Sequence, residues 1–460
     1  MAPRNFARQS RVVCSAVVLT TLAGCAGFAP STPRATTTTT PRTTTTTPGT
    51  TTTPGTTIAP TTTAPPGVPL PGSALCSAVK LRSADNPPRF SASTTWNQPV
   101  ACMKDRADSA RWATNWFNNA NLPGRTNPAE RGAINVSFDA YSSPVYSTED
   151  ATTTVRVFTA SWGYPHNLGA DNSVPWNPSW EPANGNDHEM IITDPDTGRE
   201  WGLWGVQKLN WSSCITLENI LAGWRPGVDL CVAQALVGRN PDGTYADDRI
   251  SSGFAQQAGR GMGSVLMMAL LPTLEEIEKG SINHALNMET FGTMFGPACT
   301  PSQAGTAAAG VDCGFAVSPA TRLEWHSGPT GECGAQGQQN TATDRSKTVP
   351  EGMRFALNMT DGQIDDWLNS RNYTGTKRST ARIFAVALRD YGWIISDTTC
   401  WDSAIATDGV ANPKSRQRWQ ALGITNPTTD GTTLLDGLIT SEQQVRAVES
   451  PTPALVVVTR

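Results

Sequence analysis

The chain has 460 residues, a formal net charge of −4 and only 16% charged residues. It has no basic block that could neutralise a phosphate backbone, so its composition argues against nucleic acid as a partner. All 15 tryptophans follow residue 72, in a part that is rich in Gly, Asn and Thr and has no Pro/Thr linker of its own. We therefore predict one globular domain over residues 72–460.

The start of the chain predicts an export signal. Three arginines before residue 12 form a basic segment, and residues 12–22 are an apolar stretch too short to span a membrane. The stretch ends in Leu22-Ala23-Gly24-Cys25, which resembles the lipobox at which bacterial lipoproteins are cleaved and acylated. We predict a signal peptide over residues 1–24 and a lipid on Cys25 that anchors the chain to the outer face of the membrane. The alternative is an ordinary secretory signal that contains a cysteine.

Residues 25–71 predict a disordered linker. From residue 32 onward they are nearly all Thr and Pro, so they have little to bury and cannot offset the entropy of ordering. About 40 such residues at roughly 3.1 Å each would reach on the order of 100 Å. The linker would hold the domain away from the membrane, and its composition is also typical of O-glycosylated stalks.

Eight of the ten cysteines lie in the predicted domain. An even number in an exported chain predicts disulfides, although eight cysteines allow on the order of 100 pairings. Their spacings suit neither zinc nor redox chemistry. Pairing between nearest neighbours is the simplest hypothesis, and it gives Cys76–Cys102, Cys214–Cys231, Cys299–Cys313 and Cys333–Cys400.

The first half of the domain predicts one helix followed by strands. Apolar residues at helical spacing predict a helix within Met103–Asn121. Alternating, β-branched stretches predict strands at Ala133–Tyr141 and Thr152–Trp162. Two more alternating runs, His188–Thr193 and Glu200–Val206, flank the turn residues Asp-Pro-Asp-Thr-Gly and predict a hairpin.

The second half mixes strands with helices. We predict strands at Cys214–Trp224, Asp229–Gly238 and Trp393–Thr398, a buried strand or core helix at Val265–Leu271, and helices at Asp361–Ser370, capped by Asp361, and Thr376–Gly392. Short strands, frequent turns and few helical patterns favour an all-β to α+β fold. The specific expectation is an antiparallel, jelly-roll-like β-sandwich with a few helical insertions, braced by disulfides.

His284 is one of only four histidines and is a candidate catalytic residue. It follows Asn283 on what we expect to be a strand, where His284 and Leu286 would share one face. Histidine suits proton transfer near neutral pH. The alternative is a buried histidine that is hydrogen-bonded to backbone and only structural.

Asp187-His188-Glu189 opens the predicted hairpin, and in a strand its two carboxylates would share one face. Paired carboxylates serve glycoside hydrolysis or bind a hard cation, whereas a solvated strand end is the structural alternative. Asp194 and Asp196 in the turn suggest calcium, but the further ligands of a calcium loop are missing. We predict a tight turn there and no cofactor beyond a weak case for a structural calcium.

Arg354 follows a Glu-Gly turn and lies in a predicted strand. A buried arginine needs a partner, either a structural acid such as Asp397 or a substrate carboxylate held bidentately. Tyr391 ends its helix and would pack in the core or act as an acid. On another strand, Glu324 and His326 share a polar face and are candidate substrate-binding residues.

Six tryptophans crowd into residues 162–211. Their flat apolar faces suit stacking on sugar rings, although a Trp-rich core explains most of them. Trp176 and Trp180 lie in a loop-like stretch, and we predict that these two are exposed and bind sugar.

Several stretches together resemble a family of secreted, mainly actinobacterial proteins that carry an NHAL signature. They are "NDHEMIITDPDTG", "INHAL", "SPATRLEW", "VPEGMRFAL" and "AVALRDYGWIISDT", spread over about residues 175–398. The family has no settled activity, and its likeness to jelly-roll polysaccharide-active proteins is an analogy.

These features predict a lipid-anchored, extracytoplasmic protein that binds a polysaccharide or cell-envelope glycan and, as an enzyme, would cleave it. In a lyase, Arg354 would neutralise a uronate carboxylate while His284 and Tyr391 act as base and acid. In a hydrolase, Asp187 and Glu189, or Glu324, would be acid and base. The competing prediction is a non-catalytic sugar-binding or structural lipoprotein.

Overall fold

The computed structural model describes most of residues 95–449, and the structural statements below refer to the described residues alone. These are 95–100, 103–163, 168, 172–208, 211–239, 267–300, 302–303, 310–320, 323, 341–449 and 455–456. All of them belong to the second of the two units into which the chain divides, Pro66–Arg460. The predicted signal, the lipidation site Cys25 and the linker lie outside the described residues.

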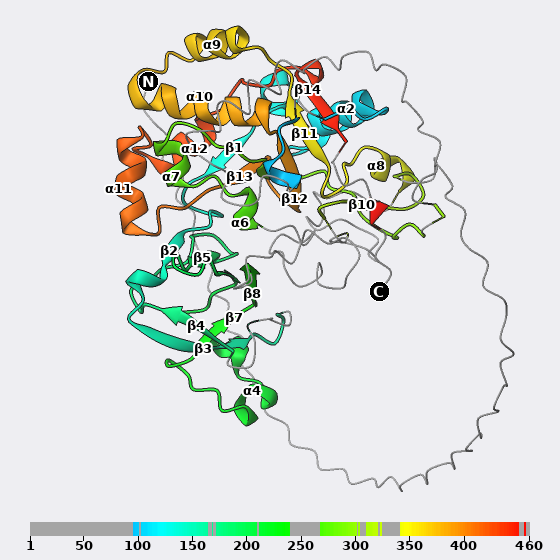
Figure 1. The fold of residues 1–460 in the computed structure, drawn as a ribbon. Coiled ribbons are helices and arrows are strands. Elements are labelled where there is room, and N and C mark those ends of the chain that lie inside the picture. The colour runs from blue at the N-terminus through cyan, green and yellow to red at the C-terminus, as the bar shows by residue number, and fades with distance from the viewer. Residues whose placement is uncertain are drawn as a thin grey trace, which may run out of the picture. The chain divides into compact units, whose positions relative to one another are not determined.

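A six-stranded mixed sheet lies in the main hydrophobic core (Figure 1). Its strands, in spatial order, are β1 (Asn135–Ser137), β13 (Ala404–Ala406), β9 (Leu286–Thr290), β12 (Trp393–Thr398), β11 (Arg354–Leu357) and β14 (Val445–Val448). β1 is parallel to β13 and β9 is parallel to β12, whereas the other neighbouring strands are antiparallel.

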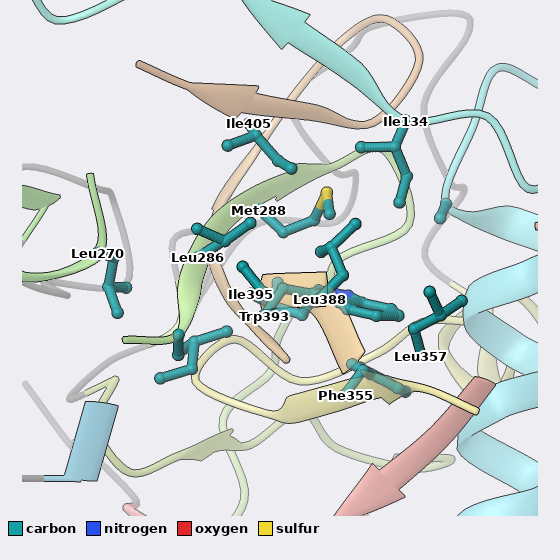
Figure 2. Close-up of a cluster of buried hydrophobic side chains, with 14 of the residues drawn as sticks. Ile134, Leu270, Leu286, Met288, Phe355, Leu357, Leu388, Trp393, Ile395 and Ile405 are labelled. Atoms are coloured by element: carbon teal, nitrogen blue, oxygen red, sulfur yellow. The ribbon is translucent and has the colours of Figure 1, made fainter. Parts of the chain in front are cut away.

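Helices also contribute side chains to this core. They include α2 (Ser109–Asn119), α9 (Asp361–Ser370), α10 (Gly375–Asp390) and α11 (Pro413–Ala421), whereas α12 (Pro427–Thr433) ends just before the core residues Leu434 and Leu435. Figure 2 shows Leu388 of α10 meeting Leu286, Phe355 and Trp393 of the sheet. The Trp393 ring lies 5.0 Å from that of Trp116 and stacks on Phe355 at 5.8 Å. Aromatic pairs of this kind contribute about 0.5–1.5 kcal/mol beyond the burial of their area.

Two smaller sheets have a core of their own. The four-stranded sheet has the order β2 (Val145–Ser147), β5 (Met190–Thr193), β6 (Glu200–Trp204), β8 (Gln234–Arg239). The three-stranded sheet has the order β4 (Ser173–Trp176), β3 (Thr153–Thr159), β7 (Leu230–Val232). Separately, β10 (Ala316–Val317) pairs with β15 (Leu455–Val456). Side chains from both smaller sheets pack into one cluster.

Short elements complete the described structure. They are η1 (Thr95–Asn97), α3 (Pro128–Arg131), η3 (Thr148–Asp150), η4 (Trp211–Cys214), α4 (Leu217–Leu221), α6 (Met267–Leu270), α7 (Leu274–Glu278), α8 (Ala342–Ser346) and η6 (Glu442–Gln444). None of the described helices is long and apolar enough to cross a membrane.

Asp408 ties β2 to the segment that follows β13. Its carboxylate accepts from the backbone N–H of Val145 at 3.1 Å and from the hydroxyl of Ser415 at 3.1 Å. Its carbonyl accepts from the indole of Trp419 at 2.6 Å. Asn412 adds a bond to the carbonyl of Val145 at 2.7 Å. A buried acid thus connects the β2 edge to the main core through satisfied hydrogen bonds.

Most predicted elements are confirmed, including the helices around 109–119, 361–370 and 375–390. The hairpin is confirmed as β5 and β6, which pair in antiparallel register across a tight turn. In that turn Asp194 accepts from the N–H groups of Asp196 and Thr197 and from the Thr197 hydroxyl. The apolar stretch at 265–271 contains the core helix α6.

Two expectations were wrong, and the predicted fold class held only in outline. Cys214–Trp224 is not a strand, because residues 217–221 form the helix α4. The cap of α9 is Thr360, not Asp361, because Thr360 and Gln363 form a reciprocal capping box. The fold is mixed α/β, with a mixed central sheet and helices in its core, and the described residues do not confirm a β-sandwich.

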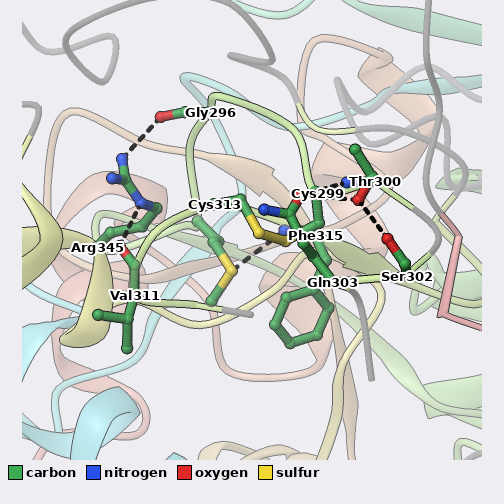
Figure 3. Close-up of a disulfide and its surroundings, with 10 residues drawn as sticks. Gly296, Cys299, Thr300, Ser302, Gln303, Val311, Cys313, Phe315 and Arg345 are labelled. Carbon is green, nitrogen blue, oxygen red and sulfur yellow. Dashed lines mark hydrogen bonds between the residues drawn. A yellow bond between two sulfur atoms is a disulfide. The ribbon is translucent and has the colours of Figure 1, made fainter. Parts of the chain in front are cut away.

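Two predicted disulfides are confirmed, Cys214–Cys231 and Cys299–Cys313. Figure 3 shows the second beside Arg345, whose guanidinium donates to the carbonyls of Gly296 and Val311, each at 2.8 Å. Cys400 is also disulfide-bonded. The predicted pairings 76–102 and 333–400 involve residues outside the described ranges and stay predictions.

Candidate functional site

His284 is buried and contacts acceptors through both ring nitrogens. It precedes β9 instead of lying in it. Nδ1 lies 2.7 Å from the carbonyl of Ala285, and Nε2 lies 3.1 Å from a carboxylate oxygen of Glu276 in α7. Both ring nitrogens of His284 are thus engaged within the protein. The same carboxylate caps α7 by accepting from Thr273. His284 thereby connects the start of α7 to the start of β9.

This geometry predicts energetic coupling between His284 and Glu276. In a double-mutant cycle of His284→Ala and Glu276→Ala, we expect a coupling free energy of about 1–3 kcal/mol, because the two side chains share a buried hydrogen bond. Urea unfolding of the four chains measures it, and the cycle cancels the separate capping role of Glu276. A coupling near zero would show that the two side chains do not stabilise each other.

Arg354 is the most completely enclosed charged side chain of the predicted set, with 1% of its surface exposed. Its guanidinium donates to the carbonyls of Thr95 at 2.6 Å and Gln98 at 2.7 Å. It also donates to the carbonyl of Tyr391, from Nε at 2.9 Å and from a second nitrogen. Burial lowers the pKa of Arg354 to about 9, so it remains charged at neutral pH. The expected partner Asp397 is not among these contacts, because three backbone oxygens take its place.

Of the four predicted residues Asn283, His284, Arg354 and Tyr391, the structure brings Arg354 and Tyr391 into direct contact, through the Tyr391 carbonyl. His284 is linked to the same 95–98 segment only through backbone, because the N–H of the next residue, Ala285, donates to the carbonyl of Trp96 at 2.8 Å. Asn283 and Tyr391 are buried as well. The contacts of His284 and Arg354 favour the structural alternative over proton transfer to a substrate.

Asp187, His188 and Glu189 precede β5 and do not continue a strand. His188 has φ +44°, a left-handed conformation in which strand alternation does not apply. Asp187 accepts from the indole of Trp204 at 3.2 Å, and Glu189 accepts from the hydroxyl of Ser143 at 2.7 Å. The two carboxylates thus have separate partners and do not form the shared face that we expected.

Trp176 and Trp180 are buried, which corrects the prediction that they are exposed. Their exposed fractions are 6% and 4%. The Trp180 ring stacks on Tyr146 at 4.9 Å and meets Trp176 edge-on at 5.9 Å, within the core of the smaller sheets. They cannot stack on a sugar without leaving that core. Glu324 and His326 lie outside the described residues.

Glu289 and Asp397 form a carboxylate pair that the sequence patterns did not indicate. They are register partners at the carboxyl ends of the parallel strands β9 and β12, where one extra residue bulges β12. Register partners in a sheet project from the same face. Both side chains are half-buried, and Asp397 also accepts from the N–H of Thr398 at 2.9 Å. Ligands in α/β proteins bind preferentially at the carboxyl ends of parallel strands.

An exposed tryptophan follows this strand end. Trp401 is 61% exposed, and its N–H donates to the Thr399 hydroxyl at 3.1 Å, while Thr399 is held to Thr290 of β9. The next residue, Asp402, forms an ion pair with Arg125 at 2.6 Å. A flat exposed ring is therefore held four residues from Asp397. No local sequence pattern could have shown that Glu289 and Asp397 become register partners, because the two residues are far apart in the sequence.

Metal binding finds no support among the described residues, where no three or more His, Cys, Asp or Glu side chains gather to hold an ion. The resemblance to secreted proteins with an NHAL signature stays a prediction. No protein-family model, curated protein or solved structure matches this chain.

Proposed function

We propose that the protein is a lipid-anchored, extracytoplasmic protein that binds carbohydrate at the cell envelope. Export is supported by the disulfides Cys214–Cys231 and Cys299–Cys313, because structural disulfides persist in oxidising compartments. The anchor rests on the lipobox-like residues before Cys25. The proposal does not depend on a jelly-roll fold.

The carboxylate pair Glu289–Asp397 carries the proposal. Carboxylates accept hydrogen bonds from sugar hydroxyls, and an exposed indole such as Trp401 offers a face for a sugar ring. Glu289 and Asp397 lie on neighbouring strands. Glycoside hydrolases use two carboxyl groups, so hydrolysis is the enzymatic form of the proposal. The site replaces the hydrolase assignment to Asp187 and Glu189, whose carboxylates have separate partners.

A structural lipoprotein is the second candidate, and the contacts of His284 and Arg354 favour it. His284 bonds to a backbone carbonyl and to the Glu276 carboxylate that caps α7, and Arg354 bonds to backbone carbonyls. A lyase that uses Arg354 to neutralise a uronate would have to withdraw it from three carbonyls in the core. Lyase chemistry is therefore the less supported enzymatic form.

The test compares the full chain with Glu289→Gln and Asp397→Asn on a panel of neutral and acidic polysaccharides. We expect each substitution to weaken binding by about tenfold or more, because a charge-assisted hydrogen bond is lost. If a glycan is hydrolysed, we expect the rate of new reducing ends to fall by about 10²–10⁴-fold. Affinity electrophoresis measures binding, and ultraviolet absorbance distinguishes unsaturated lyase products from hydrolysis.

Glu275→Gln is the matched control, because Glu275 is an exposed carboxylate that pairs with Lys279 on the surface of α7. It should leave binding unchanged. Failure of the folded wild-type chain to bind or cleave any glycan in the panel would contradict the carbohydrate proposal and leave the structural lipoprotein as the better account.

A further inference from the structure

Exposed apolar side chains are concentrated in one loop of the described structure. We define the finger as residues 214–231, which the Cys214–Cys231 disulfide closes at its base. Seven large hydrophobic side chains are exposed among the described residues, and five belong to the finger: Ile215, Leu217, Ile220, Leu221 and Val228. Each is more than half exposed, and Leu217 and Leu221 reach 74% and 79%. A concentration of exposed apolar side chains in one short loop is typical of an interaction surface.

Figure 1 shows the helix of the finger, α4. Its polarity is inverted relative to an ordinary surface helix, as its hydrogen bonds and exposed side chains show. Asn219 faces the protein body, where its amide donates to the carbonyls of Thr159 at 2.9 Å and Cys214 at 3.0 Å. Leu217, Ile220 and Leu221 face outward. A soluble helix normally turns its apolar stripe to the core. The outward aliphatic face is therefore a feature of the folded loop and needs a partner to cover it.

The base of the finger is held firmly, so the apolar face is presented in a defined way. Trp224 is buried and packs edge-on against Phe158 at 5.2 Å. Asp229, fully buried, accepts from Arg225 and Arg156. Burial by itself would raise the pKa of Asp229, but hydrogen bonds from the two arginines outweigh it and lower that pKa. The carboxylate therefore stays ionised beneath two guanidinium groups.

The outward chemistry of the finger fits a lipid surface. Its exposed residues are aliphatic, which gives no preference for stacking on sugar rings. Arg225 is exposed at the edge of the patch while its counterion Asp229 is buried, and Glu218 is the one exposed acid of α4. Trp162 adds a half-exposed indole beside the base, where Ser161 bonds to Ser213. Aliphatic tips with a flanking indole and arginine are typical of segments that enter the membrane interface.

The chain outside the structure argues for the same partner. By the sequence, the segment before residue 95 leads back through the predicted linker, which would reach on the order of 100 Å, to the predicted acyl anchor at Cys25. A tether of this length keeps the domain at high effective concentration near the bilayer, so that even a weak patch is engaged. We propose that the finger inserts its aliphatic side chains into the outer surface of the membrane and gives the anchored domain a second contact. This inference rests on the proposed lipid anchoring.

The test uses the full chain with Cys25→Ser, which cannot be acylated, and measures flotation with phosphatidylcholine vesicles, with and without phosphatidylglycerol. We expect this chain to float with both. Adding Leu217→Ser and Leu221→Ser should lower the partition coefficient by at least about tenfold, because two exposed leucines no longer leave water. Trp401→Ser is the matched control, since it removes an exposed large apolar residue outside the finger, and flotation should persist.

The outcomes separate the membrane from other partners. No flotation of the Cys25→Ser chain, or equal flotation of the two-leucine variant, overturns the inference. A dimer in light scattering that the two leucine substitutions dissociate, without flotation, assigns the finger to a second copy and also overturns it. Fatty-acid labelling of the wild-type chain at Cys25 tests the anchor separately, so failure of the anchor is distinguishable from failure of the finger.

Discussion

Replacing Arg354 by methionine should lower the free energy of unfolding by at least about 3 kcal/mol. The substitution keeps an apolar side chain of similar length in the core but removes the donors to the carbonyls of Thr95, Gln98 and Tyr391. Each lost hydrogen bond to a charged donor costs about 1.5–3 kcal/mol. Urea unfolding monitored by tryptophan fluorescence measures the loss, and faster proteolysis near residues 95–98 should accompany it.

Arg354→Lys is the informative companion variant. A lysine keeps the charge but cannot reach three carbonyls from a planar fork, so it should recover only part of the stability. If the methionine variant instead keeps wild-type stability but loses glycan binding, Arg354 serves the substrate and not the fold. The two variants thus decide between the structural and the substrate-binding role of this arginine.

Replacing Trp180 by alanine should lower the free energy of unfolding by about 3–5 kcal/mol, which is the usual cost of truncating a buried tryptophan. The ring stacks on Tyr146 and touches Trp176, so its loss leaves a cavity in the core of the smaller sheets. Thermal or urea unfolding of the full chain measures the effect.

Trp401→Ala is the matched control for this experiment. It also truncates a tryptophan, but an exposed one, and surface substitutions usually change stability by about 0.5 kcal/mol or less. If Trp180→Ala were as mild as the control and weakened glycan binding, the original prediction of an exposed sugar-binding ring would be restored. Equal, large losses in both variants would contradict the exposure of Trp401.

The two pairs of variants bear on different parts of the molecule. Arg354 holds the segment at 95–98 against the central sheet, whereas Trp180 fills the core of the smaller sheets. Neither forms a hydrogen bond, ion pair or ring contact with Glu289 or Asp397, so the stability experiments and the glycan experiments are independent. If a Glu289→Gln chain folds but fails to bind glycan, the site is located at Glu289. A substitution of the buried His284 would not separate loss of binding from loss of stability.

Local patterns were sufficient for many elements of the fold. The period of apolar residues over 375–390 predicted α10, and alternation around the turn at 194–198 predicted the hairpin of β5 and β6. These signals are contained within a few residues, because helix and strand periodicities are properties of neighbouring side chains. The same argument failed at 217–221, where five residues are too few to separate a helix from a strand.

Contacts between distant segments decided everything that bears on the site. The sequence by itself determined the likeness to a lipoprotein signal, the low-complexity linker, the main helices and the hairpin, and it identified His284 and Arg354 as residues that need partners. Only the tertiary structure decided that those partners are Glu276 and backbone carbonyls, that Trp176 and Trp180 are buried, and that Glu289 and Asp397 meet. The physical reason is that burial and pairing depend on which strands become neighbours, and β9 and β12 lie far apart in the sequence, beyond the reach of any local pattern.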